Sequence, residues 1–457
     1  MEQYKCNIDF TNEIKKDILG VGVEWDPPMY DCTPDFTEEQ WELIFKRLDF
    51  FKLKFARMMM YSPLPESGAT ENNYEDRRVK NVIRVLEYCQ KNDVKVMLGM
   101  WNKPYWVERY DDPVWIRSIA DLILYFREKG FTCIKYFNFV NEPNGSWEIP
   151  DNNWYQWKPA VTALHSEFEA RGVTPETKIC GPDSAYDDEW VDMCIAAIPQ
   201  VIGEYEYHIY IHDKAEIVNN QLERRLNHKR WAITKNDPDG PNKRLWLGEF
   251  GCRDGKWDER TDMQDSVYDF IYGVWIADAV CQAFRAGLDG IIPWNMDDAA
   301  HTSSVDGKTD GNFKRWGFWN SYGGQTITGN AGSVDHPPED TAIRPWYYPM
   351  SLFSRLFKQG STVVDAGEAQ GYIKVCACKN GDEYTVILVN ASNEVAKVSL
   401  ELYGLEGSAG KIYKYCYFDH DCPTDENGFP VVKEVLQGFP QNVELSGKGV
   451  MFLSTMS

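Results

Sequence analysis

Short runs of apolar and β-branched residues alternate along the first 360 residues with longer stretches whose apolar positions recur at helical spacing. Runs of this kind that alternate with helices are typical of βα units and a parallel sheet. Eight candidate strands are present: Ile18–Glu24, Lys54–Met60, Lys95–Trp101, Tyr136–Glu142, Lys178–Asp183, Tyr205–Tyr210, Leu245–Phe250 and Gly290–Asn295.

The amphipathic stretches between these runs predict eight helices. In the first, Thr37–Lys52, Thr37 and Gln40 are spaced for a capping box ahead of an apolar stripe. The others are Arg77–Gln90, Pro113–Lys129, Asn153–Arg171, Glu189–Val201, Glu216–Lys235, Tyr268–Ala286 and Arg344–Lys358. Eight strands, each followed by a helix, predict an α/β fold of the (β/α)8 TIM barrel type over residues 11–360.

The pattern changes after Gly360 to short alternating strands without a helix signal. These strands are Ser361–Val364, Tyr372–Cys378, Tyr384–Asn390, Ala396–Leu402, Lys411–Phe418 and Val450–Ser454. We therefore expect a C-terminal β-sandwich domain over residues 361–457. Another strand, Gln3–Phe10, could pair with this sandwich or lie across the bottom of the barrel, so residues 1–10 have two possible places.

One connection, Asp297–Thr341, is too long for an ordinary loop in a compact domain. Loops of this length are often functional. We expect a lid whose aromatic residues line a cleft, namely Trp316, Phe318, Trp319 and Tyr322.

Charge and composition narrow the choice of partner. The net charge of −22 repels phosphate backbones and anionic lipid headgroups, which argues against a nucleic acid or a membrane surface as the partner. Aromatic residues make up 14% of the chain, with 17 Trp, a content that suits ligands able to stack on rings, sugars among them. A neutral partner is the expectation.

The chain has no apolar run of transmembrane length, and its first residues lack the features of a secretion signal. The 12 Cys are scattered as single residues, which is more typical of reduced thiols than of a disulfide framework. We expect a cytoplasmic protein, or a secreted or periplasmic one if a signal peptide has been removed. No His pair has zinc-ligand spacing, so we expect no metal.

Polar and aromatic residues gather where the predicted strands end. In barrels of this kind the carboxyl ends of the strands meet at one mouth, where the active site lies. The residues at these ends are Arg57, Trp101, Asn102, Asn141, Glu142, His208, Tyr210, Glu249, Trp294 and Asn295. We expect them to form one site.

Two of these residues, Glu142 and Glu249, suit cleavage of a glycosidic bond. The reaction needs one carboxyl that holds a proton for the leaving oxygen and another that meets the positive charge developing on the sugar. A lone Asn-Glu-Pro could instead simply start a turn, since Pro143 ends the run. A second glutamate on another strand end makes the catalytic interpretation stronger.

With Asn141-Glu142-Pro143 on the fourth strand and Glu249 on the seventh, the chain resembles the glycoside hydrolases of clan A, which are retaining (β/α)8 glycosidases. Asn144, Trp147 and Lys178-Ile179-Cys180-Gly181-Pro182 make it most similar to family 39, as does the appended sandwich, with family 5 as the competitor. Trp101-Asn102 stands where family 5 usually has a His, so the contacts to the sugar's 3- and 4-hydroxyls stay open.

The resemblance implies a role for each matching residue. Glu142 would be the general acid/base and Glu249 the nucleophile, while Asn141 would donate to the sugar 2-hydroxyl. Arg57 would orient the nucleophile, His208 and Tyr210 would match the His-x-Tyr of the sixth strand, and Trp294 would be the platform on which the sugar stacks.

The sequence thus predicts a retaining glycosidase that acts on β-linked oligosaccharides or polysaccharides without a cofactor. Two alternatives stay open: a transglycosylase with the same residues, and a carbohydrate-binding barrel without turnover. Arg57, His208 and Tyr210 could also be structural residues. The identity of the sugar, exo or endo action and the oligomeric state are not determined by these patterns.

Overall fold

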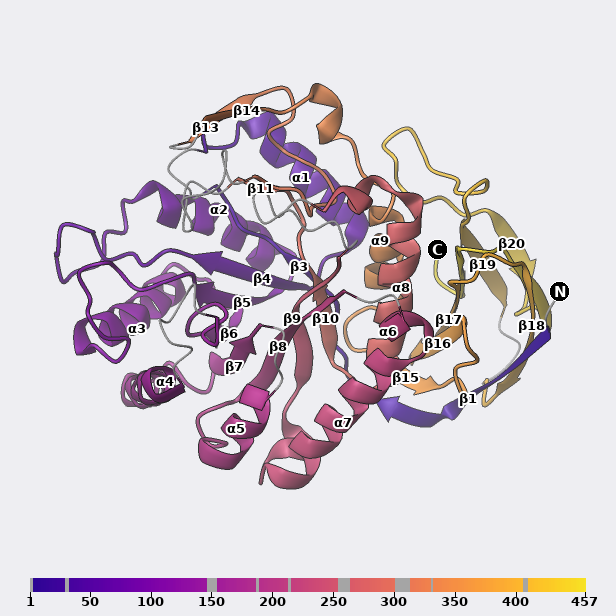
Figure 1. Cartoon of the computed structure of the whole chain (residues 1–457), viewed down its shortest axis with the longest axis horizontal. Coiled ribbons are helices and arrows are strands. Elements are labelled where there is room, and N and C mark those ends of the chain that lie inside the picture. Colours follow the sequence, from indigo (N-terminus) through magenta and orange to yellow (C-terminus); the bar gives the residue numbers. More distant parts are fainter. Residues whose placement is uncertain are drawn as a thin grey trace.

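The computed structural model describes residues 3–28, 33–145, 154–185, 189–212, 215–253, 264–300, 313–329, 332–405 and 410–457. Trp147 lies outside these residues. A parallel sheet forms the centre of the larger part of the molecule (Figure 1). Its strands are β2 (Gly20–Val21), β3 (Val23–Glu24), β4 (Phe55–Met60), β5 (Lys95–Met100), β6 (Ile134–Asn138), β7 (Lys178–Ser184), β8 (Glu204–Ile211), β9 (Leu245–Cys252) and β10 (Gly290–Pro293).

The sheet closes into a barrel through its first strand. β2 pairs with β10 and β3 pairs with β4, so β2 and β3 are two halves of one strand interrupted at Gly22. A Cβ at Gly22 would lie 2.7 Å from the carbonyl oxygen of Phe55, a distance at which only glycine fits. The closed ring therefore has eight strands, and the predicted (β/α)8 barrel is confirmed.

Helices surround the barrel: α1 (Glu38–Phe51), α2 (Arg77–Lys91), α3 (Pro113–Glu128), α4 (Trp154–Ala170), α5 (Glu189–Ala197), α6 (Ala215–Val218), α7 (Gln221–Asn236), α8 (Phe270–Arg285) and α9 (Tyr347–Leu356). The capping box of α1 is present, because Thr37 and Gln40 bond reciprocally. The predicted helix Glu216–Lys235 is wrong as one element. Asn220 adopts left-handed backbone angles there and separates α6 from α7.

Several predicted boundaries also differ. The helix expected from Tyr268 begins as a 3-10 turn, η2 (Asp265–Tyr268), and becomes α-helical only at Phe270, because Asp269 is extended. The strand predicted to end at Glu142 ends at Asn138, although Asn141 still donates its backbone N–H to the Met100 carbonyl. Glu249 lies within β9 rather than at its end.

A second, nine-stranded mixed sheet curls around its own core at the other end of the molecule (Figure 1). Its strands in spatial order are β20 (Glu434–Gln437), β19 (Lys411–Tyr417), β22 (Gly449–Ser454), β17 (Glu383–Asn390), β16 (Ile373–Asn380), β15 (Thr362–Asp365), β1 (Gln3–Lys15), β18 (Ala396–Tyr403) and β21 (Asn442–Leu445). The expected C-terminal β-structure is therefore present. β20 and β21 were not predicted from the sequence.

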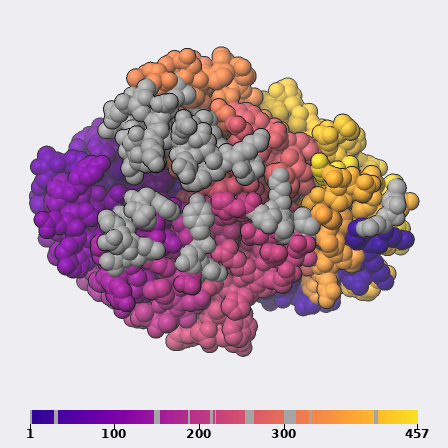
Figure 2. Space-filling view, viewed as in Figure 1, coloured from indigo at the N-terminus to yellow at the C-terminus, as the bar shows by residue number. Residues whose placement is uncertain are grey.

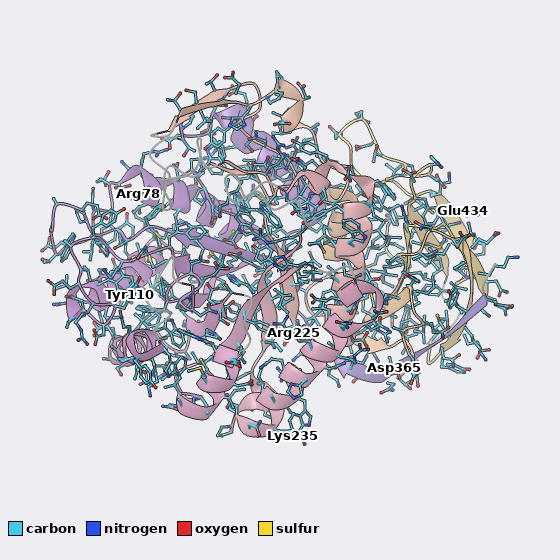
Figure 3. All side chains as sticks on the ribbon, viewed as in Figure 1. Arg78, Tyr110, Arg225, Lys235, Asp365 and Glu434 are labelled. Carbon is cyan, nitrogen blue, oxygen red and sulfur yellow. The ribbon has the colours of Figure 1, made fainter. Side chains whose placement is uncertain are left out.

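The N-terminal strand belongs to this second sheet. β1 runs parallel to β18 and antiparallel to β15, which decides between the two places considered for it. The indigo N-terminal residues accordingly lie against the orange and yellow C-terminal ones in Figure 2. Asp365, labelled in Figure 3, accepts a hydrogen bond of 3.0 Å from Asn12 where β1 meets β15.

The long connection after β10 holds short elements: β11 (Ala299–Ala300), β12 (Phe313–Lys314), β13 (Thr326–Gly329), β14 (Gly332–Asp335) and η3 (Pro338–Thr341). A further turn, η1 (Gly240–Asn242), precedes β9. The sequence predicts that Phe318 and Trp319 line a cleft. This is wrong, because both are buried with Trp346 and Tyr347 in the main core. Among the described helices, none is long and apolar enough to cross a membrane.

Candidate active site

Arg57 is the hub of a charged cluster at the mouth of the barrel. It sits in the middle of β4, an otherwise apolar strand, and is fully buried. Its Nη1 donates to Glu24 at 2.6 Å and to Glu249 Oε1 at 2.8 Å, and its Nη2 donates to Asn141 Oδ1 at 2.8 Å. The single guanidinium thus links β3, β9 and the segment after β6, and it orients the Glu249 carboxylate.

Asp183, at the end of β7, is the second connecting residue. It accepts from Arg57 Nη2 at 3.0 Å, from the backbone N–H of Glu142 at 3.1 Å, and lies 3.0 Å from His208 Nε2. Burial would raise its pKa, but the charges of Arg57 and His208 outweigh burial and lower the pKa well below its usual value. Asp183 is therefore a permanent anion that supports the loop carrying Glu142.

His208 and Tyr210 project from β8 toward the two glutamates. The Nδ1 of His208 lies 2.9 Å from Glu142 Oε1 and 3.6 Å from Glu249 Oε2. Tyr210 donates its hydroxyl proton to Glu249 Oε2 at 2.6 Å. His208 is fully buried, so its ring nitrogens contact these protein groups rather than solvent.

Glu142 and Glu249 face one another across His208. A carboxylate oxygen of each glutamate and a ring nitrogen of His208 all lie within 4.8 Å of one another. Burial raises the pKa of Glu142, and the charge of Glu249 adds to the increase, while the hydrogen bond from His208 opposes it. The arrangement favours a protonated Glu142 beside Glu249.

Backbone geometry marks the same place. Glu142 has a φ of +42° and Asp183 a φ of +60°, both in the left-handed region that costs a residue with a side chain about 1–2 kcal/mol. Strain of this kind persists where surrounding contacts hold it, and it gathers at functional sites. The bond from the Glu142 N–H to Asp183 is one such contact.

The aromatic residues expected at the mouth fall into two places. Trp294, directly after β10, packs edge-on against Trp316, which also packs against Tyr210. Trp316 therefore connects Trp294 to Tyr210, which bonds Glu249. Trp101 and Asn102 follow β5 and are half-buried, and Asn102 accepts a hydrogen bond from Tyr110 at 3.3 Å.

Three site residues were not selected from the sequence: Glu24, Asp183 and Glu206. Glu24 and Asp183 are the last residues of the predicted first and fifth strands, so the strand-end rule applied to every strand would have found them. Glu206 lies inside β8 and is fully buried, and burial raises its pKa well above the usual value. Its position carries no sequence signal, because a buried mid-strand carboxyl is recognised only by its neighbours.

Two groups of side chains here have the geometry of metal ligands: Glu142, His208 and Glu249, and Asp183, Glu206 and His208. Both depend on His208, whose pKa is raised well above its usual value because the charges of Glu249 and Asp183 outweigh burial. A histidine must be neutral to ligate a metal. Glu249 and Asp183 also already have a cationic partner within the protein, the guanidinium of Arg57.

Neither a scan against protein-family models nor a search of curated proteins found a match. Solved structures do match. A GH30 endoxylanase from Clostridium papyrosolvens C71 has a TM-score of 0.63 at 12% identity, and a GH39 β-xylosidase from Caulobacter crescentus has 0.63 at 13%. A conserved exported protein from Bacteroides fragilis has 0.65 at 14%. Each comparison covers 98% of this chain and 99% of the other. The likeness extends over both sheets, and at this identity it is a likeness of fold.

Proposed function

We propose that the protein is a retaining glycosidase of the clan A type that cleaves β-linked glycosides. The observation that carries this proposal is the meeting of Glu142 and Glu249 across His208, with carboxylate oxygens within 4.8 Å. Double displacement uses carboxyls about 5–5.5 Å apart, whereas a gap of about 6.5–9.5 Å admits an attacking water for inversion. The close spacing supports the covalent route.

In the proposed first step, Glu249 attacks the anomeric carbon while Glu142 gives its proton to the leaving oxygen. The hydrogen bonds from Arg57 and Tyr210 hold Glu249 as a carboxylate aimed at one position. The raised pKa of Glu142 keeps its proton available. In the second step Glu142 takes a proton from water, whose oxygen displaces Glu249 and releases the sugar.

The charge contribution from Glu249 supports this change of role. The charge of Glu249 is one of the causes that raise the pKa of Glu142. Once Glu249 is esterified to the sugar its charge is gone, the pKa of Glu142 falls, and Glu142 becomes the base that the second step needs. We propose that five further residues contact the sugar: Asn141, Trp101, Asn102, Trp294 and Asn295.

The test is a panel of aryl β-glycosides that begins with the xyloside, because two of the similar structures are a xylanase and a xylosidase, and continues with glucoside, mannoside and galactoside. We expect hydrolysis of at least one, with the β-anomer released first in proton NMR. Glu249→Gln should lose several orders of magnitude in turnover, whereas the surface control Glu394→Gln should not. First release of the α-anomer would overturn the retaining mechanism.

A further inference from the structure

A small cavity of about 30 Å³ lies between the segment after β3 and the segment after β10. Its wall includes Asp26 and Thr33 from the first segment, Asn295 and Asp297 from the second, and Tyr322. A volume of this size exceeds the roughly 10–15 Å³ that one water needs. It therefore suits one or two hydroxyl-sized groups.

One carboxylate oxygen in this wall lacks a partner. Asp297 is only 8% exposed, and its Oδ1 accepts the backbone N–H of Ser321 at 2.9 Å. Its Oδ2 has no hydrogen-bond partner within the described part of the chain. A buried acceptor left without a donor is unfavourable. A ligand that brings an O–H to this oxygen would remove that cost.

Asp26 is a second carboxyl in the wall. Its Oδ1 accepts the backbone N–H of Met59 at 2.9 Å. Burial raises its pKa to about 7, and the charge of Glu249 contributes to the increase while Arg57 opposes it.

The cavity also adjoins the proposed sugar platform. Asn295, in its wall, directly follows Trp294, and Trp294 packs on Trp316 beside Tyr210. Tyr210 in turn bonds Glu249. The cavity wall is therefore one residue along the chain from Trp294, and Trp294 is linked through Trp316 and Tyr210 to Glu249.

We propose that this cavity is a binding subsite for the hydroxyl groups on the far edge of a neutral sugar, with Asp26 and Asp297 as the specificity-determining residues. The inference rests on the proposed function and names its substrate class. Carboxylates bind sugar hydroxyls as acceptors. Burial raises the pKa of both Asp26 and Asp297 to about 7, so the cavity already disfavours negative charge, and the carboxylate of a uronic acid would add more. The site accordingly favours neutral β-glycosides over β-linked uronic acids.

The experiment uses the best neutral aryl β-glycoside of the panel, its 4-deoxy analogue and the corresponding uronide. Asp297→Asn and Asp26→Asn are compared with Asp419→Asn, a control that changes an exposed aspartate in the turn after β19. We expect each cavity variant to lose about 10- to 100-fold in kcat/KM on the full sugar, the range of a hydrogen bond to a charged group. The loss of kcat/KM on the 4-deoxy analogue should be under about 3-fold. The ratio of kcat/KM for the uronide to that for the neutral sugar should rise in both variants.

Binding separates this inference from the proposed function. Calorimetric titration of Glu249→Gln with the intact glycoside, with and without Asp297→Asn, measures how much the cavity contributes to binding affinity in the absence of turnover. Weaker binding in the double variant supports the subsite even if no glycoside is hydrolysed by the wild type. Equal losses on the full and deoxy sugars, or unchanged binding in the double variant, would overturn it.

Discussion

At the scale of single residues, the protonation state of Glu142 is the property on which the proposed chemistry depends. Its proton matters most when the leaving group is poor. We expect Glu142→Ala to lose several orders of magnitude on natural glycosides while dinitrophenyl glycosides still form the glycosyl-enzyme, with azide accelerating release as a β-glycosyl azide. Equal losses on good and poor leaving groups, without an azide product, would contradict the acid/base role.

Glu206 allows a second test at this scale, on stability. A carboxyl whose pKa is raised by folding stabilises the native state below its unfolded pKa near 4.5, and that contribution is lost as the pH rises toward its folded pKa. Glu206→Gln replaces the carboxyl by an amide that does not ionise, so the variant does not lose this stability as the pH rises. The free energy of unfolding of the variant should therefore rise relative to that of the wild type by about 1.4 kcal/mol per pH unit above pH ~4.5.

Denaturant unfolding at several pH values between 4 and 8 measures this difference. The matched control is Glu394→Gln, which changes an exposed glutamate and should run parallel to the wild type. Parallel curves for Glu206→Gln as well would mean that Glu206 is ionised in the folded protein.

At the scale of elements, helix α8 joins the barrel to the second sheet through a buried ion pair. Asp278 of α8 lies 3.4 Å from Lys374 of β16, and both side chains are fully buried. Losing one partner of such a pair costs about 3–5 kcal/mol, because the other charge stays buried alone. We expect Lys374→Met to have this effect and Asp278→Leu combined with Lys374→Met to recover most of it.

The pH dependence of that cost has a definite sign. Burial raises the pKa of Asp278 to about 6 even with Lys374 nearby to lower it. Without Lys374 the carboxyl can take up a proton and lose its charge, so Lys374→Met should be less destabilising at pH 5 than at pH 8. Unfolding free energies of the two single variants and the double variant, at both pH values, check this. A cost independent of pH would argue that Asp278 stays charged.

At the scale of the whole molecule, the question is whether barrel and second sheet unfold together. The division into residues 11–360 and 361–457 stays a prediction. The junction includes bonds from Arg285 of α8 to the carbonyls of Val375 and Gly367, and one from Tyr417 to the Phe270 carbonyl. These contacts favour a single cooperative unit.

Tryptophan fluorescence reports on this directly, since all 17 Trp lie between Trp25 and Trp346 and none in the second sheet. Ile8 of β1 is fully buried in the second sheet, so Ile8→Ala should cost about 2–5 kcal/mol. We expect the fluorescence midpoint to fall by the same amount as the far-UV signal. The exposed neighbour Asn7→Ala should change neither by more than about 0.5 kcal/mol. An unchanged fluorescence transition in Ile8→Ala would show independent domains.

The sequence by itself determined the barrel, because strand and helix periodicities are local and eight βα units close in one way. It also placed Arg57, Asn141, Glu142, His208, Tyr210 and Glu249 at one mouth, since parallel strands end on the same side. Only the tertiary structure decided which residues and strands contact one another. Glu206 is recognised by its neighbours on other strands, and β1 by its pairing with β18 nearly 400 residues away. Phe318 and Trp319 are recognised by the core that buries them. Such contacts depend on long-range packing and hydrogen bonding, which leave no period in the local sequence.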